Sequence, residues 1–201
     1  MTRIRPRIVI ASAILVALSL AIAACAATPP TRFYALTPVA GAESPPSPDR
    51  ALAVGLEPVD LPGYLDRPQI VTRSTPVQID LADLDHWAEP LDGMVTQTLA
   101  ESLFRLAPAQ SVVVLPRQHG TRLDRIVEVT VRRFDVDAGS SAVLEAEWRI
   151  FDSDDQQIAG SRFRTQSPVS AAGDYQAMVR AMSDSLGLLA QEIAQGLTAT
   201  R

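Results

Sequence analysis

The sequence predicts an α+β fold, with a mostly antiparallel sheet and two long helices packed on one face. Residues 142–151 alternate between apolar and polar side chains, as in a strand with one buried face. Residues 90–107 and 174–197 carry apolar side chains at spacings of three and four, which indicates helices with one apolar stripe. About 175 residues follow the N-terminal apolar segment, enough for one domain with its own core.

The N-terminus has the layout of a secretory signal peptide. Three arginines within the first seven residues precede an uncharged apolar run at 8–22, two alanines and Cys25. A membrane-spanning helix needs about 20 apolar residues, so this shorter run favours a cleaved signal, with a retained anchor as the alternative.

The end of this segment, Ile22-Ala23-Ala24-Cys25, resembles the bacterial lipobox. The resemblance implies that residues 1–24 are a lipoprotein signal peptide and that Cys25 becomes the lipidated N-terminus, carrying diacylglycerol and a fatty acyl chain. No other cofactor is expected. The alternative, a plain signal peptide with an incidental cysteine, would leave an unpaired reactive thiol in an exported protein.

A short tether follows the lipidation site. Residues 25–31 form the lipidated N-terminus and tether, and the folded domain is expected at 32–198. The six residues 26–31 reach only about 20 Å when extended. We therefore expect the domain to lie close to the membrane surface.

The chain is acidic once the signal peptide is removed. Residues 1–24 hold three arginines and no acidic residue, which leaves 15 basic against 23 acidic residues and a net charge of −8. An acidic surface argues against nucleic acid as a partner and against electrostatic adsorption to anionic lipid. Attachment to the membrane must then come from the lipid anchor.

Short apolar runs bounded by proline and glycine predict the first strands. They lie at 32–36, 51–59, 69–74, 77–81 and 111–115, with the third and fourth forming a hairpin around Ser74-Thr75-Pro76. Residues 37–50 are rich in Pro, Ala, Gly and Ser and predict no core element.

The first helix is expected at 90–107. Pro90 suits the first helical position, and Asp92 lies in the first turn, where the helix dipole favours an anion. Pro108 ends the helix. Its apolar stripe consists of Leu91, Val95, Leu99, Leu103 and Leu106.

Three longer strands and a final helix complete the domain. In 125–137 the apolar positions change face at Arg132-Arg133, which predicts a β-bulge. A turn at 153–155 joins 142–151 to a partner strand at 157–166. In the helix at 174–197, Asp174 is the expected N-cap, and the core stripe consists of Tyr175, Met178, Val179, Met182, Leu186, Leu189, Ala190, Ile193 and Leu197.

The sequence offers no catalytic residues and no metal site. The only histidines, His86 and His119, lie in loop contexts, and with Cys25 lipidated no zinc site can be assembled from Cys and His. Acidic residues at 152–155 could bind calcium but lack the length and glycine of an EF-hand loop, so a solvated turn is expected. Nucleophile-elbow, P-loop and dinucleotide-binding motifs are absent from the sequence. We therefore expect a protein that is not an enzyme.

Three stretches together resemble one family. They are "LPGYLDRPQIVTR" (61–73), "LDHWAEPL" (84–91) and "VEVTVRRFDVDAGSSAVLEAEWRIFD" (127–152). They are similar to the PqiC-type, or YmbA-like, ABC-type transport auxiliary lipoproteins, and the resemblance extends from "RFYAL" to the final helix.

The resemblance implies a non-catalytic accessory subunit of a transport system. Family members are encoded with mammalian-cell-entry (MCE) domain proteins and ABC transporter parts, and an MCE-domain protein is the implied partner. The implied function is to dock the periplasmic MCE assembly to the outer membrane in intermembrane lipid transport or organic-solvent resistance. Ala26 after the lipidated cysteine, in place of Asp, implies the periplasmic face of the outer membrane. The alternative is a periplasmic lipid carrier, and a homo-oligomeric ring would suit docking.

The most specific stretch has two interpretations. Pro62 and Pro68 stiffen the chain around Tyr64, Leu65, Asp66 and Arg67, which suits a partner-binding loop. Alternatively, the loop is a structural turn with Tyr64 and Leu65 in the core and Asp66 paired to Arg67 or Arg73. Trp87 is likewise either an exposed anchor for a partner or a core residue at the helix entry.

Overall fold

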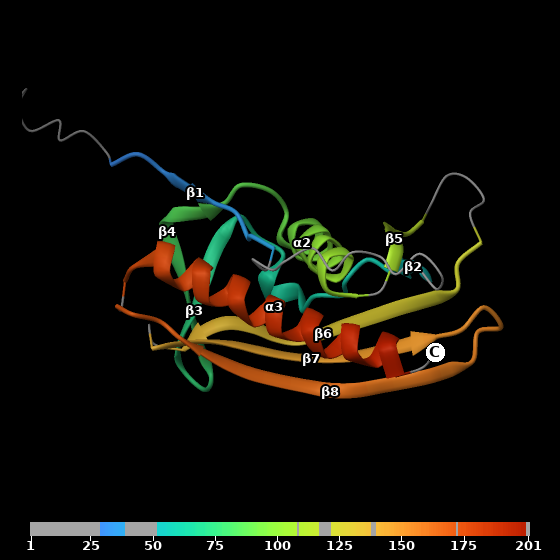
Figure 1. Ribbon diagram of the computed structural model, residues 1–201. Helices are drawn as coiled ribbons and strands as arrows, with labels where there is room; N and C mark the ends of the chain where they lie inside the picture. Colours follow the sequence, from blue (N-terminus) through green and yellow to red (C-terminus); the bar gives the residue numbers. More distant parts are fainter. Residues whose placement is uncertain are drawn as a thin grey trace, which may run out of the picture. The chain divides into compact units, whose positions relative to one another are not determined.

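The structure is a computed structural model that describes residues 29–38, 52–107, 109–116, 122–137, 140–171 and 173–199 (Figure 1). Predictions for the signal peptide, Cys25, His119 and residues 39–50 lie outside the described residues. Thr31–Arg201 is one compact unit. No helix in the described ranges is long and apolar enough to cross a membrane.

The described strands form one eight-stranded sheet. Its longest ladders are antiparallel and join the three long strands, β6 to β7 and β7 to β8. The strands are β1 (Arg32–Tyr34), β2 (Leu52–Leu56), β3 (Gln69–Thr75), β4 (Gln78–Trp87), β5 (Ala109–Val114), β6 (Arg125–Asp137), β7 (Ser141–Phe151) and β8 (Gln157–Pro168).

The α+β class is confirmed, but the sheet is mixed. β3 and β4 form the expected antiparallel hairpin, whereas β1 pairs with β4, β2 with both β5 and β6, and β3 with β6, all in parallel. Two of the parallel pairs arise because β2 and β3, joined by the segment 57–68, both lie beside β6 and run in its direction. Apolar alternation reports which face of a strand is buried and not the direction of its neighbour.

The bulge in β6 is confirmed. The register with β7 shifts between Val131 and Arg133, and one extra residue in a strand reverses the side-chain alternation beyond it. As a result Phe134 and Val136 return to the same side of the sheet as Val127, and all three are buried.

The two helices are α2 (Leu91–Leu106) and α3 (Tyr175–Ala199). α3 lies along β6, β7 and β8, and α2 packs beside α3 and against β5 (Figure 1). The expected stripe of α3 is buried apart from half-buried Tyr175. Asp174 accepts a 3.0 Å hydrogen bond from the backbone of Ala177, as expected of an N-cap.

One glycine lets α3 approach the sheet closely. Gly196 lies against the indole of Trp148 on β7, where a β-carbon would come within 2.8 Å of Trp148 Cη2. One turn earlier, Glu192 accepts a 2.8 Å hydrogen bond from Trp148 Nε1. Trp148 therefore sets both the spacing of α3 and its position along the sheet.

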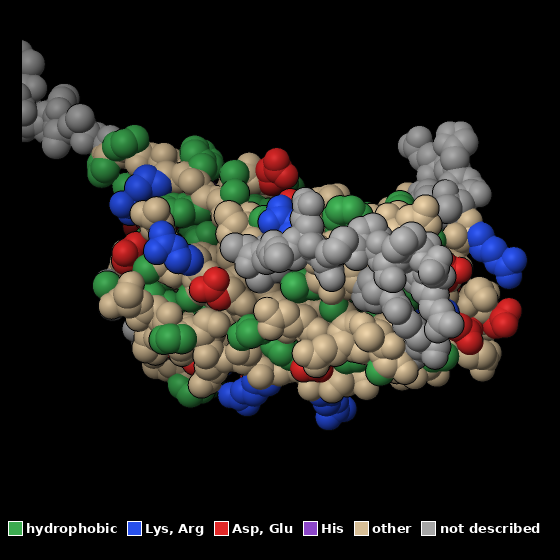
Figure 2. Space-filling view, viewed as in Figure 1, with side chains coloured by type: hydrophobic (Ala, Val, Ile, Leu, Met, Phe, Trp, Pro, Cys, Tyr) green, Lys and Arg blue, Asp and Glu red, His purple; other side chains and the backbone are tan. Residues whose placement is uncertain are grey.

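β4 extends further than its sequence suggests. The second strand of the hairpin continues through His86 to Trp87, so the expectation of a loop at His86 was wrong. The strand continues because β1 supplies parallel partners for Asp85, His86 and Trp87. Figure 2 shows hydrophobic side chains at the surface around β1 and β4, where the exposed residues include Phe33 and Leu81.

Candidate functional site: a groove between two sequence motifs

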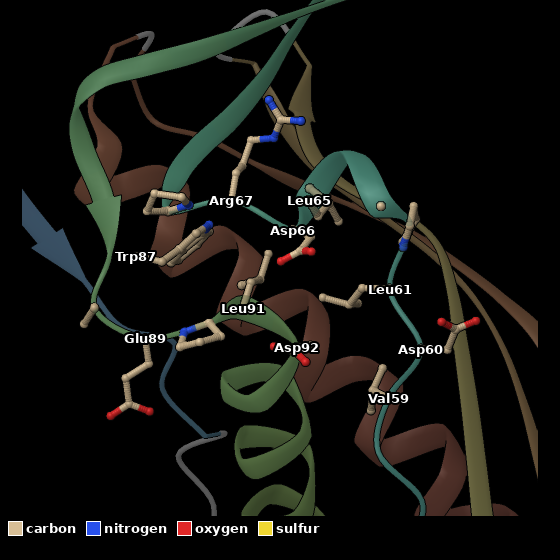
Figure 3. Close-up of a pocket in the computed structure, with 15 residues that line it drawn as sticks. Val59, Asp60, Leu61, Leu65, Asp66, Arg67, Trp87, Glu89, Leu91 and Asp92 are labelled. Atoms are coloured by element: carbon tan, nitrogen blue, oxygen red, sulfur yellow. The ribbon is translucent and has the colours of Figure 1, made fainter.

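A surface groove of about 620 Å³ lies between two loops (Figure 3). One wall is the segment 59–68, which leads from β2 to β3 and contains the short 3-10 helix η1 (Gly63–Leu65). The other wall is residues 87–92, from the end of β4 into the first turn of α2. Two of the three stretches singled out in the sequence thus meet in one place.

The first wall is shaped by a proline and by backbone bonds. Pro62 is extended, and its carbonyl accepts a 2.9 Å hydrogen bond from the amide of Leu65, which closes η1. Before it, the chain runs beside β6: the Asp60 carbonyl accepts from Val131 at 2.8 Å and the Asp60 amide donates to Val129 at 3.1 Å. The amide of Trp87 donates to the Pro68 carbonyl at 2.7 Å and joins the two walls.

The floor of the groove belongs to the hydrophobic core. Its four apolar side chains are each at most 4% exposed: Val59, Leu65, Trp87 and Leu91. Leu61 is half-buried and adds an accessible apolar surface on the first wall. Trp87 is therefore a core residue at the helix entry and not an exposed anchor.

The rim of the groove is acidic. Four exposed carboxylates line it, those of Asp60, Asp66, Glu89 and Asp92, against the single cation of Arg67. None of these five residues forms an ion pair with another described residue. In Figure 3 Asp66 lies on the side of Leu61 and Leu91, and the Arg67 guanidinium points away from them.

A buried charge network holds the first wall against β6 and β3. Asp135, fully buried on β6, accepts hydrogen bonds from Tyr64 Oη at 3.0 Å, Arg73 Nη2 at 2.8 Å and Arg133 Nε at 2.8 Å. The Arg73 guanidinium also lies 5.8 Å from the centre of the Tyr64 ring, within cation–π range. Burial, and then the Asp135 charge, raise the pKa of Tyr64, so its hydroxyl stays a donor.

A second buried carboxylate holds the start of the domain. Asp85 on β4 is 4% exposed and accepts hydrogen bonds from Arg32 at 2.8 Å and Tyr34 at 2.7 Å, both on β1. Burial opposes the charged form of Asp85, but the bonds from Arg32 and Tyr34 outweigh it and lower the pKa of Asp85. Burial and the bond to Asp85 raise the pKa of Tyr34 to about 12.

The structure brings four of the five predicted partner-binding residues to the groove. Leu65, Asp66, Arg67 and Trp87 line it, whereas Tyr64 is absent from its lining and points to Asp135. Arg73 also pairs with Asp135 and not with Asp66. The described lining also includes residues that the sequence did not single out for binding, and their position beside the same motifs was the available signal; among them are Asp60, Leu61, Glu89 and Asp92.

Metal chemistry finds no support in the described ranges, which contain no group of three or more His, Cys, Asp or Glu residues that could hold a metal ion. The acidic residues after β7 form a turn in which Asp152 Oδ1 accepts from the amides of Asp154 at 2.9 Å and Gln156 at 3.0 Å. The groove itself offers a binding surface with apolar and acidic parts.

Comparison with known proteins gives one family. The model of the family described as "ABC-type transport auxiliary lipoprotein component" matches residues 34–194. Among curated protein sequences, none matches the chain.

Solved structures share the fold. Protein XCC0632 from Xanthomonas campestris, which carries the DUF330 family model, is 21% identical with a TM-score of 0.70, over 84% of this chain and 95% of that one. An uncharacterized protein is 23% identical with a TM-score of 0.68, over 84% and 99%. These identities establish likeness of fold alone.

Proposed function

Since the chain belongs to the family of ABC-type transport auxiliary lipoprotein components, we propose that it is an outer-membrane-anchored, non-catalytic subunit of an MCE/ABC-type transport system. It docks the periplasmic MCE assembly to the outer membrane, and the system moves lipid between the membranes or confers resistance to organic solvents. The family match over residues 34–194 carries this proposal. A role as a transport accessory and a membrane-anchored envelope location follow from the family itself.

Cys25 is the proposed anchor. Its sulfur forms a thioether to diacylglycerol, and a fatty acyl chain blocks its amino group, with Ala26 directing the protein to the outer membrane. The tether up to Thr31 is short, so the domain meets its partner at the membrane surface. The multiple acyl chains of such an anchor retain a protein far better than one chain does.

The groove between 59–68 and 87–92 is the proposed docking surface. Its walls rest on the core and on the Asp135 network, so its shape exists before a partner binds, which lowers the entropic cost of association. The predicted residues Leu65, Asp66, Arg67 and Trp87 line it. Tyr64 does not line the groove but holds its first wall against β6 through the hydrogen bond to Asp135.

Co-purification tests the partner. We expect the full chain, tagged and extracted in mild detergent, to recover an MCE-domain protein, and Cys25→Ser to abolish both radioactive fatty-acid labelling and recovery in the outer-membrane fraction. Ala26→Asp should move the labelled protein to the inner membrane without loss of label, which separates lipidation from sorting.

Two outcomes would contradict the proposal. Repeated native pull-downs without any MCE-domain protein would remove the docking role. Stoichiometric lipid co-extracted with the full chain, together with no such partner, would favour the lipid carrier. Size measurement in detergent tests the homo-oligomer that we propose for docking, and a strict monomer at high concentration would exclude it.

A further inference from the structure

The carboxylates at the rim of the groove differ from the two buried carboxylates of the domain, because no described arginine pairs with them. Behind the first wall, Asp135 is matched by Arg73 and Arg133, and at the start of the domain Asp85 is matched by Arg32. At the rim, four carboxylates face solvent without an ion pair to any described residue. With Arg67 as the cation among the described lining residues, the rim is net negative, and beside low-dielectric apolar walls it favours ligands of positive charge.

The arrangement of apolar and acidic groups narrows the ligand further. Half-buried Leu61 offers an accessible apolar surface above the buried Trp87 and Leu91, and Asp66 lies on the same side as Leu61 and Leu91 (Figure 3). Asp92 stands in the first turn of α2, on the opposite wall from Asp66. A ligand in the groove therefore meets an apolar contact and at least one carboxylate within the same short stretch.

We propose that the groove binds a segment of a partner protein in which an arginine or lysine stands next to a large apolar side chain. The apolar side chain covers Leu61, and the cation pairs with Asp66 or Asp92, where an arginine can form two parallel hydrogen bonds. Anionic lipid headgroups meet repulsion at the same rim. This inference rests on the proposed function, because it names the chemistry of the docking partner.

The two tryptophans of the chain provide a built-in probe. Trp87 lines the groove, whereas Trp148 is buried between β7 and α3 and is bonded to Glu192. In the full chain in detergent, 5-fluorotryptophan gives two ¹⁹F signals, which Trp87→Phe and Trp148→Phe variants assign. We would titrate three blocked pentapeptides: Ser-Arg-Leu-Arg-Ser, Ser-Glu-Leu-Glu-Ser and Ser-Arg-Ser-Arg-Ser.

We expect the Arg-Leu-Arg peptide to move the Trp87 signal saturably, at millimolar concentrations or below, and to leave the Trp148 signal in place. The other two peptides should move neither. Asp66→Asn with Asp92→Asn should weaken binding about fivefold, the effect of two partly screened ion pairs. The matched control, Asp154→Asn with Asp155→Asn, removes the same charge in the β7–β8 turn, outside the groove, and should bind like the parent.

Four results would overturn the proposal. The first is a Trp87 signal that does not move at up to about 10 mM Arg-Leu-Arg peptide, beyond the range of weak contacts. The second is equal binding of the acidic peptide, and the third is undiminished binding by the rim variant. The fourth is a Trp87 shift caused by protein concentration alone, which would assign the groove to a second copy. None of these four results depends on whether the chain co-purifies with an MCE-domain protein. The groove chemistry and the transport role therefore fail separately.

Discussion

The hydroxyl of Tyr64 donates a 3.0 Å hydrogen bond to the fully buried carboxylate of Asp135, 71 residues further along the chain. Tyr64 comes from the stretch 61–73 and Asp135 from the stretch 127–152. This bond and the ion pair between Arg73 and Asp135 tie a wall of the groove to the centre of the sheet. A residue that does not line the groove thus controls the position of those that do.

The Asp135 network can be tested by comparing two nearly isosteric changes. Asp135→Asn should lower the free energy of unfolding by about 3 kcal/mol, because Arg73 and Arg133 lose their shared anion in a buried site. Tyr64→Phe removes one hydrogen bond and should cost about 1 kcal/mol. Urea denaturation of the full chain, followed by tryptophan fluorescence, measures both. Equal costs would mean that the charge of Asp135 is irrelevant to stability.

Gly196 and Gly93 provide a matched pair in the two helices. Gly196→Ala should lower the free energy of unfolding by about 1–2 kcal/mol, because its β-carbon would lie 2.8 Å from Trp148 Cη2 and overpack the contact. Gly93→Ala in α2 meets no atom within 4 Å. It should leave stability unchanged or raise it by up to about 1 kcal/mol, since alanine is the better helix former. A Gly196→Ala protein as stable as Gly93→Ala would show that α3 can move away from the sheet at little cost.

Alkaline pH should weaken the attachment of β1. Burial and the bond to Asp85 raise the pKa of Tyr34 to about 12 from its ordinary value of 10.0. The stability contributed by the protonated hydroxyl is therefore fully present below pH 10 and is lost as the pH rises towards about 12. The difference in unfolding free energy between the parent and Tyr34→Phe should shrink over this window, because all other titrating groups are common to the two proteins. A constant difference would show that ionisation of the Tyr34 hydroxyl does not contribute to the pH dependence of the unfolding free energy.

Acidic pH should also weaken the attachment of β1, through protonation of Asp85. The pKa of Asp85 is lowered in the folded protein, so its contribution is present above the ordinary value of 3.8 and is lost as the pH falls through the lower, folded value. Asp85→Asn should be less stable than the parent at neutral pH, and the difference should narrow below about pH 4. Denaturation series at both pH values measure this. A difference that widens in acid would contradict the assignment.

Local patterns predicted most of the elements. Alternation in 142–151, the face change at Arg132-Arg133 and the apolar stripe of α3 each depend on near neighbours in the chain, and the structure confirms all three. Asp174 was predicted as a cap for the same reason, since its partner lies three residues away.

Contacts between distant residues could not be predicted in this way. The parallel pairing of β1 with β4, and with it the length of β4, depends on partners about 53 residues apart. The carboxylates of Asp85 and Asp135 look like ordinary surface acids in sequence, because all their arginine and tyrosine partners except Arg133 lie 51 to 71 residues away. For the groove, the sequence predicted residues of both walls, in two separate stretches. It did not predict that the two stretches meet, which only the fold shows.

The place where the chain enters the sheet has a mechanical consequence. Tension on residues preceding Thr31 reaches β1 first, and β1 is held at the sheet edge by three register pairs with β4 and by the side-chain bonds to Asp85. The next attachment is at Leu36, which is buried. Under load β1 should therefore detach before the ladders of β6, β7 and β8, and release of its residues up to Ala35 would lengthen the connection by about 14 Å. A domain tethered through this segment can yield a short distance without unfolding its core.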